Sequence, residues 1–273
     1  MKHFVFVFIL CAGSSHQFQE LPQIKENEDK FIIGGSPSTE GELPYQILLQ
    51  NQGRYVCGGS FVNVTGVHFV LTAAHCVNSR YPTRYTVIAG EHDRTHVSGH
   101  EQKRAVTKIF VHEKYSSRTI QNDIALLVLD EPFEVNEFVS PIPLPTQGQK
   151  TKGEVMVSGW GYTSPMRRFG STSKVLKKVT ISVIDNLACK AFYGVHFIYV
   201  SNSMLCVGKL RGFSSSCFGD SGGPLRSVEG GYVAGIVSWG TICAFPLQPG
   251  VYTEVSRYVN WIELKASSVG LPE

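Results

Sequence analysis

The stretch CFGDSGGP, residues 217–224, sets Ser221 in a loop made largely of glycine. A serine hydroxyl is a weak nucleophile until a base removes its proton, so the loop by itself could be an ordinary tight turn. Gly219 and Gly222 flank the serine and leave room for a substrate. The backbone N–H groups of Gly219 and Ser221 can both point at a developing oxyanion. The stretch therefore raises the question of a base and of a residue that orients it.

Two further stretches, LTAAHC at residues 71–76 and NDIALL at residues 122–127, supply those residue types. Taken singly, His75 beside a cysteine could be structural, and Asp123 before an apolar run could be a turn residue. Imidazole titrates near neutral pH, so His75 can act as the base. Asp123 can hold the imidazole in one tautomer and stabilise its charged form. Because the three roles are complementary, the sequence favours a catalytic triad of His75, Asp123 and Ser221.

Together with SWG at residues 238–240 and PGVY at residues 249–252, these stretches resemble the chymotrypsin family of trypsin-like serine proteases. The resemblance runs in order from residue 32 to about residue 267. It implies an all-β fold of two six-stranded antiparallel β-barrels with the active site between them, plus a C-terminal α-helix. His75 and Asp123 would come from the first barrel and Ser221 from the second.

The pattern of apolar residues agrees with this fold class. Short runs rich in β-branched residues, separated by turn residues, are typical of strands. Near the end, Val255, Tyr258, Val259 and Ile262 have helical spacing, which predicts one amphipathic helix. We expect a first barrel within residues 32–145, and a second barrel with the helix within residues 146–273. The net charge of +3 does not suggest binding to nucleic acid.

The first residues indicate export from the cell. Lys2 and His3 precede a short apolar run and then small residues, which is typical of a signal peptide. The run is shorter than the roughly 20 residues that a membrane span needs. We therefore expect a signal peptide at residues 1–15, a polar pro-segment at residues 16–31 and a secreted protein without a membrane anchor.

The cysteines fit an extracellular protein. The sequence has seven, and one of them, Cys11, lies within the expected signal peptide. The even number that remains suggests disulfides, but spacing alone does not choose among the 15 pairings of six cysteines. The resemblance implies three bridges: Cys57–Cys76, Cys189–Cys206 and Cys217–Cys243. Relatives often carry a further bridge at the positions of Val155 and Ser227, and this chain lacks it.

The stretch DKFIIGG, residues 29–35, contains the expected activation site. In the family, the amine released by cleavage pairs with the aspartate before the nucleophile, which implies a pair between Ile32 and Asp220. Cleavage after Lys30 would leave the amine on Phe31, displaced by about 3.5 Å. The productive cut is therefore expected at the Phe31–Ile32 bond. An enzyme that cleaves after aromatic residues, this one included, could make it.

Substrate preference is expected to depend on a slot beside the nucleophile. The resemblance places Ser215 at its base and Gly240 and Gly250 on its walls. A neutral base and small walls favour aromatic or large apolar residues, whereas a carboxylate would favour Lys or Arg. Elastase-like preference is the alternative, because Phe218 at the rim could pack on the substrate and Thr241 with Ile242 could narrow the slot. Three residues are expected to pair with the substrate backbone: Ser238, Trp239 and Gly240.

These features predict a secreted serine endopeptidase made as a zymogen. The alternative from another class is a catalytically silent homologue that acts by binding. Expected partners are protein or peptide substrates and protein protease inhibitors, for a monomer that requires no cofactor. Asn63 is the one expected glycosylation site. A calcium ion at Glu91 and Glu101 is a weak prediction from the resemblance, and no other metal is expected.

Overall fold

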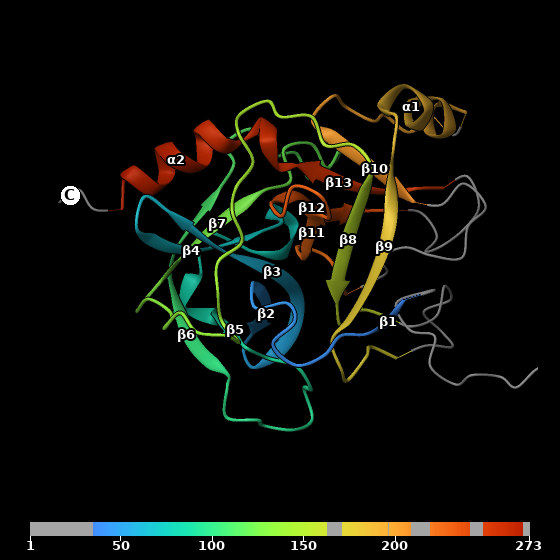
Figure 1. Ribbon diagram of the computed structural model, residues 1–273. Coiled ribbons are helices and arrows are strands. Elements are labelled where there is room, and N and C mark those ends of the chain that lie inside the picture. The colour runs from blue at the N-terminus through green and yellow to red at the C-terminus, as the bar shows by residue number, and fades with distance from the viewer. Residues whose placement is uncertain (1–34, 163–170, 196, 209–218, 241–247, 270–273) are drawn as a thin grey trace, which may run out of the picture.

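The first half of the chain closes into a six-stranded antiparallel barrel (Figure 1). In this computed structural model, residues 35–162, 171–195, 197–208, 219–240 and 248–269 are described. The strands of the barrel follow the order β2-β3-β4-β7-β6-β5. Their bounds are β2 (Gln46–Asn51), β3 (Arg54–Val64), β4 (Val67–Thr72), β5 (Tyr85–Ala89), β6 (Gln102–Val111) and β7 (Ala125–Leu129).

The second half forms a matching barrel. Its strands pair in the order β9-β10-β13-β12-β11-β8, and β9 also pairs with β8, which closes the ring. A short strand from the start of the described chain, β1 (Ser36–Pro37), adds to β9. The other bounds are β8 (Glu154–Gly159), β9 (Lys177–Ile184), β10 (Met204–Gly208), β11 (Pro224–Ser227), β12 (Val233–Trp239) and β13 (Gly250–Glu254). The two predicted barrels are thus confirmed.

Alternation of side chains explains why these segments are strands. Along β5, Tyr85, Val87 and Ala89 are buried while the residues between them are partly exposed. In a strand, every second side chain faces the same side, so these three fill the interior of the first barrel. A separate cluster that includes Val157, Ile181 and Leu225 fills the second barrel. Each half therefore has its own core.

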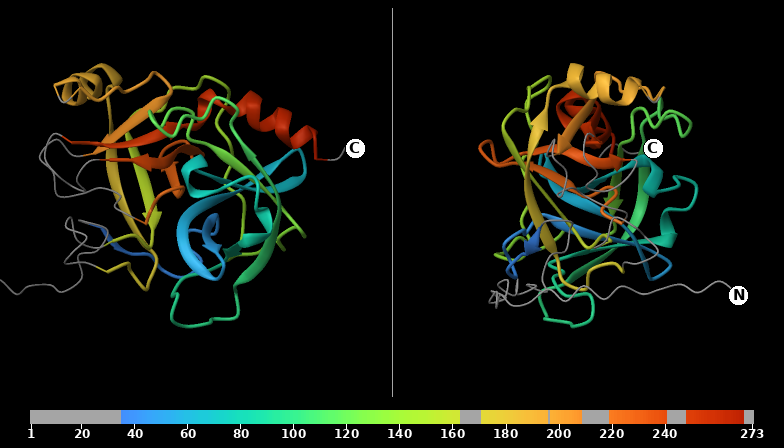
Figure 2. Two further views of the ribbon diagram at one scale, coloured as in Figure 1. Left: turned by 180° about the vertical axis from the view of Figure 1, so that it is seen from behind. Right: turned by 90° about the vertical axis from the view of Figure 1, so that its right-hand side faces the viewer.

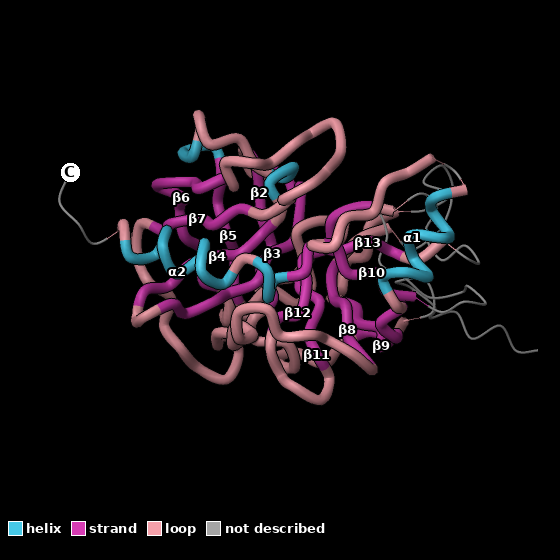
Figure 3. Tube along the Cα trace, turned by 90° about the horizontal axis from the view of Figure 1, so that it is seen from above, coloured by secondary structure: helices cyan, strands magenta, loops and turns pink. Residues whose placement is uncertain are grey.

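A third cluster of buried residues joins the two barrels. It includes Leu71 and Ile124 of the first half, and Trp160 and Ile236 of the second. The barrels lie side by side, as the views from behind and from above show (Figures 2 and 3). Because interiors are close-packed, this shared core fixes one barrel relative to the other. Residues from both halves can then form one rigid site.

The predicted C-terminal helix is present as α2 (Val259–Ser267), and it lies across the first barrel (Figure 1). The expected apolar stripe is buried: Val255, Tyr258, Val259 and Ile262. The helix begins later than the stripe, because the first residue of the stripe, Val255, lies in the 3₁₀ turn η4 (Val255–Arg257). No helix within the described segments is long and apolar enough to cross a membrane.

A second helix, α1 (Asn186–Gly194), was not predicted and lies beside the second barrel (Figure 3). It is short, and only Cys189 and Tyr193 are buried. Other apolar residues, such as the exposed Leu187, lie outside the buried side, so the sequence shows no single apolar stripe. One local signal was available. The Asp185 side chain caps the helix by accepting N–H bonds from Leu187 and Ala188.

The site of the missing bridge is packed without one. Val155 of β8 and Ser227 of β11 are register partners, so they face each other as the resemblance implied. Val155 is fully buried in the core of the second barrel. The Ser227 hydroxyl accepts a hydrogen bond from the Gly230 N–H at 3.1 Å. Apolar packing and a turn therefore occupy the place of a disulfide.

Glu113 fastens α2 to the first barrel, and we expect this contact to weaken in acid. Its carboxylate accepts from Trp261 Nε1 at 2.9 Å and pairs with Lys265 Nζ at 2.5 Å. The hydrogen bond from Lys265 is the main cause that lowers the pKa of Glu113 to about 2. A lowered carboxyl pKa adds stability that is present above the unfolded value of about 4.3, and it is lost as the pH falls toward 2.

The corresponding prediction concerns Glu113→Gln in a Ser221→Ala background, which prevents self-digestion. The Glu113 side chain is 58% exposed, so solvent screening limits the effect to less than about 1 kcal/mol. We expect the melting temperature at pH 7 to fall by about 2 °C and the difference to vanish near pH 2. Glu263→Gln, an exposed change on the same helix, is the control. An equal difference at both pH values would contradict the prediction.

Candidate active site

His75 and Asp123 meet because they follow and precede neighbouring strands. His75 lies in the 3₁₀ turn η1 (Ala74–Cys76) after β4, and Asp123 lies just before β7. Since β4 and β7 pair with Thr72 opposite Ala125, both residues lie at one end of the barrel. The Asp123 carboxylate accepts from the His75 backbone N–H at 2.9 Å and lies 2.7 Å from His75 Nδ1. The predicted pair of base and orienting acid is therefore in place.

The Asp123 carboxylate is fully buried, and both of its oxygen atoms have hydrogen-bond partners. Its Oδ2 atom also accepts from the Ser238 hydroxyl at 2.6 Å. A buried carboxylate is stable only when it is paired or hydrogen-bonded, and these contacts meet that need. With an ionised Asp123, Nδ1 carries the proton, and Nε2 is then the ring atom that can take a proton from a substrate-side hydroxyl.

Two glycines let the nucleophile loop approach the first barrel. Gly219 and Gly222 have φ of +96° and +77°, which non-glycine residues rarely adopt. A Cβ atom on Gly222 would lie 2.2 Å from Thr72 Oγ1 and 3.2 Å from Cys76 Sγ. The carbonyl of Ser221 accepts from the Gly58 N–H at 2.8 Å. The loop is therefore held against the segment that carries His75.

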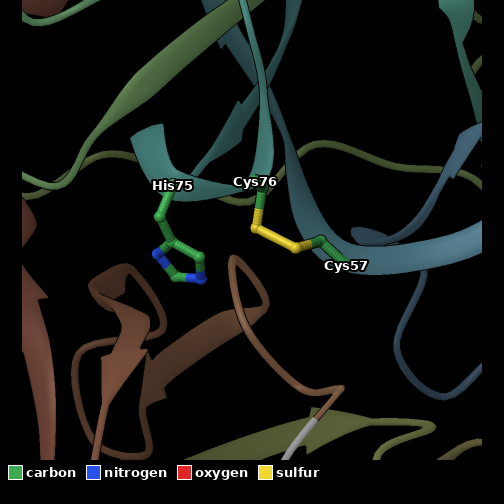
Figure 4. Close-up of side chains that lie close together, drawn as sticks. All are labelled: Cys57, His75 and Cys76. Carbon is green, nitrogen blue, oxygen red and sulfur yellow. A yellow bond between two sulfur atoms is a disulfide. The ribbon is translucent and has the colours of Figure 1, made fainter. Parts of the chain in front are cut away.

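The disulfide between Cys57 and Cys76 supports the same corner. Figure 4 shows the His75 ring beside this bridge, on the turn that carries Cys76. Among the described residues, Cys57, His75 and Cys76 are the only group with metal-ligand geometry. Because the two sulfur atoms are bonded to each other, they are not available as thiolate ligands. The group is therefore a structural bridge beside a base.

Asp220 lies behind the nucleophile in a pocket lined by glycines. It is fully buried, and its Oδ1 atom accepts from the Gly161 N–H at 2.8 Å. A Cβ atom on Gly159 or Gly161 would approach Asp220 to 2.3 Å or 2.5 Å. Glycine is required at both positions so that the carboxylate can fit. The predicted partner, Ile32, and the cleavage residue, Phe31, lie outside the described residues.

Comparisons with known proteins agree with this geometry. A model of the Trypsin family matches residues 32–262. The chain belongs to the trypsin family. It is 42% identical to Trypsin-1 of Astacus astacus over 244 residues, which are 86% of this chain and 100% of that protein. It is also similar to Trypsin-3 of Homo sapiens, at 42% over 238 residues, 87% of this chain and 73% of the relative. Trypsin of Sus scrofa is 38% identical over 237 residues, 87% of this chain and 96% of the relative.

As a member of the trypsin family, the chain is a serine endopeptidase that acts on proteins. The structure adds contacts that sequence reasoning missed. Ser238 was assigned only to the substrate backbone, yet its hydroxyl bonds to Asp123. Thr253 donates to the Asp123 carbonyl at 2.8 Å. No local signal marks either contact, because the partners lie more than 100 residues apart in the sequence.

The predicted specificity slot is only partly within the described residues. Ser215, at its expected base, lies outside them. Gly240 is exposed after β12, and a Cβ atom there would have no atom of the described residues within 4 Å. Gly250 begins β13. Trp239 packs edge-on against Tyr193 of α1, with ring centroids 5.1 Å apart. The unpredicted helix therefore supports the strand that is expected to bind the substrate backbone.

Of the other disulfides expected from the resemblance, Cys189–Cys206 is present and links α1 to β10. Cys217 and Cys243 lie outside the described residues. The bridge and the hydrogen bonds of the Asn186 side chain to the carbonyls of Ser201 and Met204 hold α1 in place. Helix α1 is therefore attached to the second barrel by one covalent bond and by two hydrogen bonds.

The two carboxylates of the predicted calcium loop have different surroundings. The Glu101 carboxylate accepts from the N–H groups of Ser98 and Gly99 at 2.8 Å and 2.9 Å. Glu91 Oε1 is buried and has no hydrogen-bond partner among the described residues. Burial, and then repulsion from Glu101, raise the pKa of Glu91. One carboxylate is thus held by its own loop, and the other has a buried oxygen without a hydrogen-bond partner among the described residues. A calcium ion at Glu91 and Glu101 stays a prediction, and no catalytic step involves one.

Asn63, the expected glycosylation site, is exposed near the end of β3. Its side-chain oxygen accepts from the Gly66 N–H at 2.9 Å across the turn into β4. Exposure is the condition that a glycan requires. Glycosylation of Asn63 stays a prediction.

Proposed function

We propose that this trypsin-family endopeptidase is secreted as an inactive precursor and cleaves after aromatic or large apolar residues. One observation carries the specificity. Ser215, six residues before Ser221, stands where a carboxylate would be needed to pair with Lys or Arg. The open position at Gly240 supports a wide slot, since no atom of the described residues would contact a Cβ atom there. Protein protease inhibitors are further proposed partners of a monomeric enzyme.

The proposed reaction uses His75, Asp123 and Ser221 as a catalytic triad. Ser221 Oγ attacks the carbonyl carbon of the substrate, and its proton moves to His75 Nε2. His75 then gives the proton to the amine as the C–N bond breaks, which leaves an acyl-enzyme. A water molecule, deprotonated by His75, then attacks the acyl carbon. The bond to Ser221 Oγ breaks, Ser221 regains its proton from His75, and the carboxylic acid product leaves. Throughout, the buried Asp123 carboxylate stabilises the charged imidazole through the 2.7 Å contact.

Cleavage after Lys or Arg is the second candidate, because the relatives described above are named trypsins. A buried ammonium or guanidinium needs a paired carboxylate, since an unpaired buried charge is costly. The sequence gives no acid at the base of the slot or on the two walls. We therefore rank cleavage after basic residues second.

Matched peptides that differ only in the residue before the bond test the specificity. We expect kcat/KM to be higher for Phe than for Arg by on the order of 100-fold, because Arg would have no partner. Ser215→Asp should raise cleavage after Arg, whereas Ser214→Asp, with the same charge one residue away, should not. Preference for Arg in the unaltered enzyme would overturn the proposal. A preference for Ala over Phe would favour the elastase-like alternative.

Activation is proposed to follow cleavage of the Phe31–Ile32 bond. The buried Asp220 carboxylate offers the charge that a new N-terminal ammonium needs. Because the bond follows Phe31, the proposed specificity would let one molecule activate another. N-terminal sequencing of the active form should begin at Ile32. A trace of active enzyme that leaves a purified Ser221→Ala precursor uncut would exclude self-activation.

A further inference from the structure

Tyr55 connects the first barrel to the oxyanion loop of the second. It lies on β3, two residues before Cys57, and its hydroxyl donates a hydrogen bond to the carbonyl of Gly219. Gly219 is the residue whose own N–H is expected to bind the oxyanion. The Tyr55 ring meets the indole of Trp160 edge-on, with centroids 6.3 Å apart. Tyr55 therefore contacts one of the two residues whose N–H groups are expected to bind the oxyanion.

The Arg94 guanidinium lies over the ring of Tyr55. Its guanidinium carbon lies 4.8 Å from the centroid of the Tyr55 ring, within the range of a cation–π contact. The same guanidinium donates to the Ser173 carbonyl from Nη2 at 2.7 Å and from Nε at 3.1 Å. Nη2 also donates to Thr172 Oγ1 at 2.8 Å. Arg94 thus ties the ring to a segment of the second half.

The surroundings of Gly219 show why this contact matters. A Cβ atom on Gly219 would lie 3.1 Å from Gly161 Cα, 3.7 Å from Thr172 Cγ2 and 3.8 Å from Tyr55 Cε1. The residue is thus enclosed by the segments that Arg94 and Tyr55 join. Glycine has wide conformational freedom, so an isolated Gly219 could rotate its peptide groups at little cost. A hydrogen bond to its carbonyl restricts that rotation.

The Tyr55 hydroxyl is suited to a permanent donor role. Burial is the main cause that raises its pKa, and the negative charge of Asp220 adds to this, while Arg94 opposes it. A raised phenol pKa keeps the hydroxyl protonated across the pH range in which proteases work. The hydrogen bond to Gly219 therefore does not depend on pH.

We propose that Tyr55 and Arg94 are positioning residues of the oxyanion hole. The Tyr55 hydroxyl holds the Gly219 carbonyl and so fixes the position of Gly219, whose own N–H is expected to bind the oxyanion. Arg94 holds the Tyr55 ring in the orientation that this requires. The inference rests on the endopeptidase function, because the oxyanion forms only during attack by Ser221.

The test compares Tyr55→Phe with the unaltered enzyme, because this change removes one oxygen and keeps the ring. Loss of an oxyanion donor costs about 100-fold or more in kcat, and loosening one should cost about tenfold. We expect kcat to fall about tenfold with KM nearly unchanged. Two probes carry the preferred substrate sequence: a peptide aldehyde, which forms an oxyanion with Ser221, and the matching alcohol, which does not. The aldehyde should bind about tenfold more weakly, and the alcohol equally well.

Three further variants sharpen the result. Arg94→Lys keeps the charge but loses the planar contact, and it should show the same selective effect at smaller size. Tyr45→Phe is the control for Tyr55, because the buried Tyr45 hydroxyl has no hydrogen-bond partner among the described residues. Arg104→Lys is the control for Arg94, since Arg104 also lies over an aromatic ring, that of Phe133, at 5.7 Å. Neither control should change kcat.

If Tyr55→Phe bound the aldehyde and the alcohol equally more weakly, Tyr55 would have a general structural role, and the inference would be overturned. The inference would also be overturned if Tyr55→Phe bound both probes as tightly as the unaltered enzyme does. Melting temperatures identify any variant that fails to fold, and the partly exposed Arg94→Lys then decides the question. If the unaltered, activated enzyme hydrolyses no peptide, the endopeptidase function fails. If it is active and Tyr55→Phe is equally active, only the positioning role fails.

Discussion

Replacing Ser221 with alanine is expected to lower kcat by about 10⁶-fold, the size of the loss found for the nucleophile of another serine protease. The change removes the only atom that attacks the substrate carbonyl and leaves the loop intact. The Ser221 carbonyl still accepts from Gly58, and Gly222 still donates to the Val237 carbonyl at 2.8 Å. Substrate binding should therefore be nearly unchanged.

Two measurements check the Ser221→Ala result. Steady-state hydrolysis of a peptide substrate gives kcat, and an active-site phosphonate should label the unaltered enzyme but not the variant. Ser60→Ala is the matched control, because Ser60 is a buried serine of β3 whose hydroxyl has no partner among the described residues. Hydrolysis by Ser221→Ala near the normal rate would refute the assignment of the nucleophile.

Asp123→Asn should lower kcat by about 10⁴-fold, the size established for the same exchange in other members of this family. The reason lies in the contacts of Asp123. If the asparagine oxygen keeps the bond from the His75 N–H, its NH₂ group replaces Oδ2 and faces His75 Nδ1. Nδ1 must then accept, so the proton moves to Nε2, which can no longer take the proton of Ser221.

The control for Asp123→Asn is Asp130→Asn, an exposed aspartate that follows β7 and bonds to the Ala105 N–H at 2.9 Å. It should keep full activity. Ser238→Ala removes one of the hydrogen bonds to Asp123 and leaves the His75 tautomer unchanged, so its loss should be much smaller. If Asp123→Asn kept most of the activity, Asp123 would not be the residue that sets the tautomer.

The local pattern of the sequence predicted the strands in general and the C-terminal helix, but it did not predict helix α1. Short runs rich in β-branched residues were expected to be strands, and β5 is one of them, with buried and partly exposed side chains in uninterrupted alternation. Helix α1 was missed, since two buried residues do not make a recognisable stripe. Strand β1 was not predicted either: it has only two residues and exists because it pairs with β9.

In the candidate site too, some residues could be predicted from the sequence and others could not. The residue types His75, Asp123 and Ser221 were evident from three stretches, because each residue type has a defined chemical role. The Ser238 hydroxyl on Asp123 and the Tyr55 hydroxyl on Gly219 were not evident. Serine and tyrosine are common, and nothing beside them in the sequence indicates a partner in the other half of the chain.

The stretch at residues 217–224 therefore determined the chemistry of this protein, and with the stretches around His75 and Asp123 it determined the fold class and the family. The tertiary structure alone decided which groups support that chemistry. Closure of the first barrel brings His75 and Asp123 to one end of adjacent strands. Packing of the two barrels on a shared core then brings Tyr55 to Gly219 and Thr253 to Asp123. Such contacts depend on strand register and on the mutual position of the barrels, which no local stretch of sequence specifies.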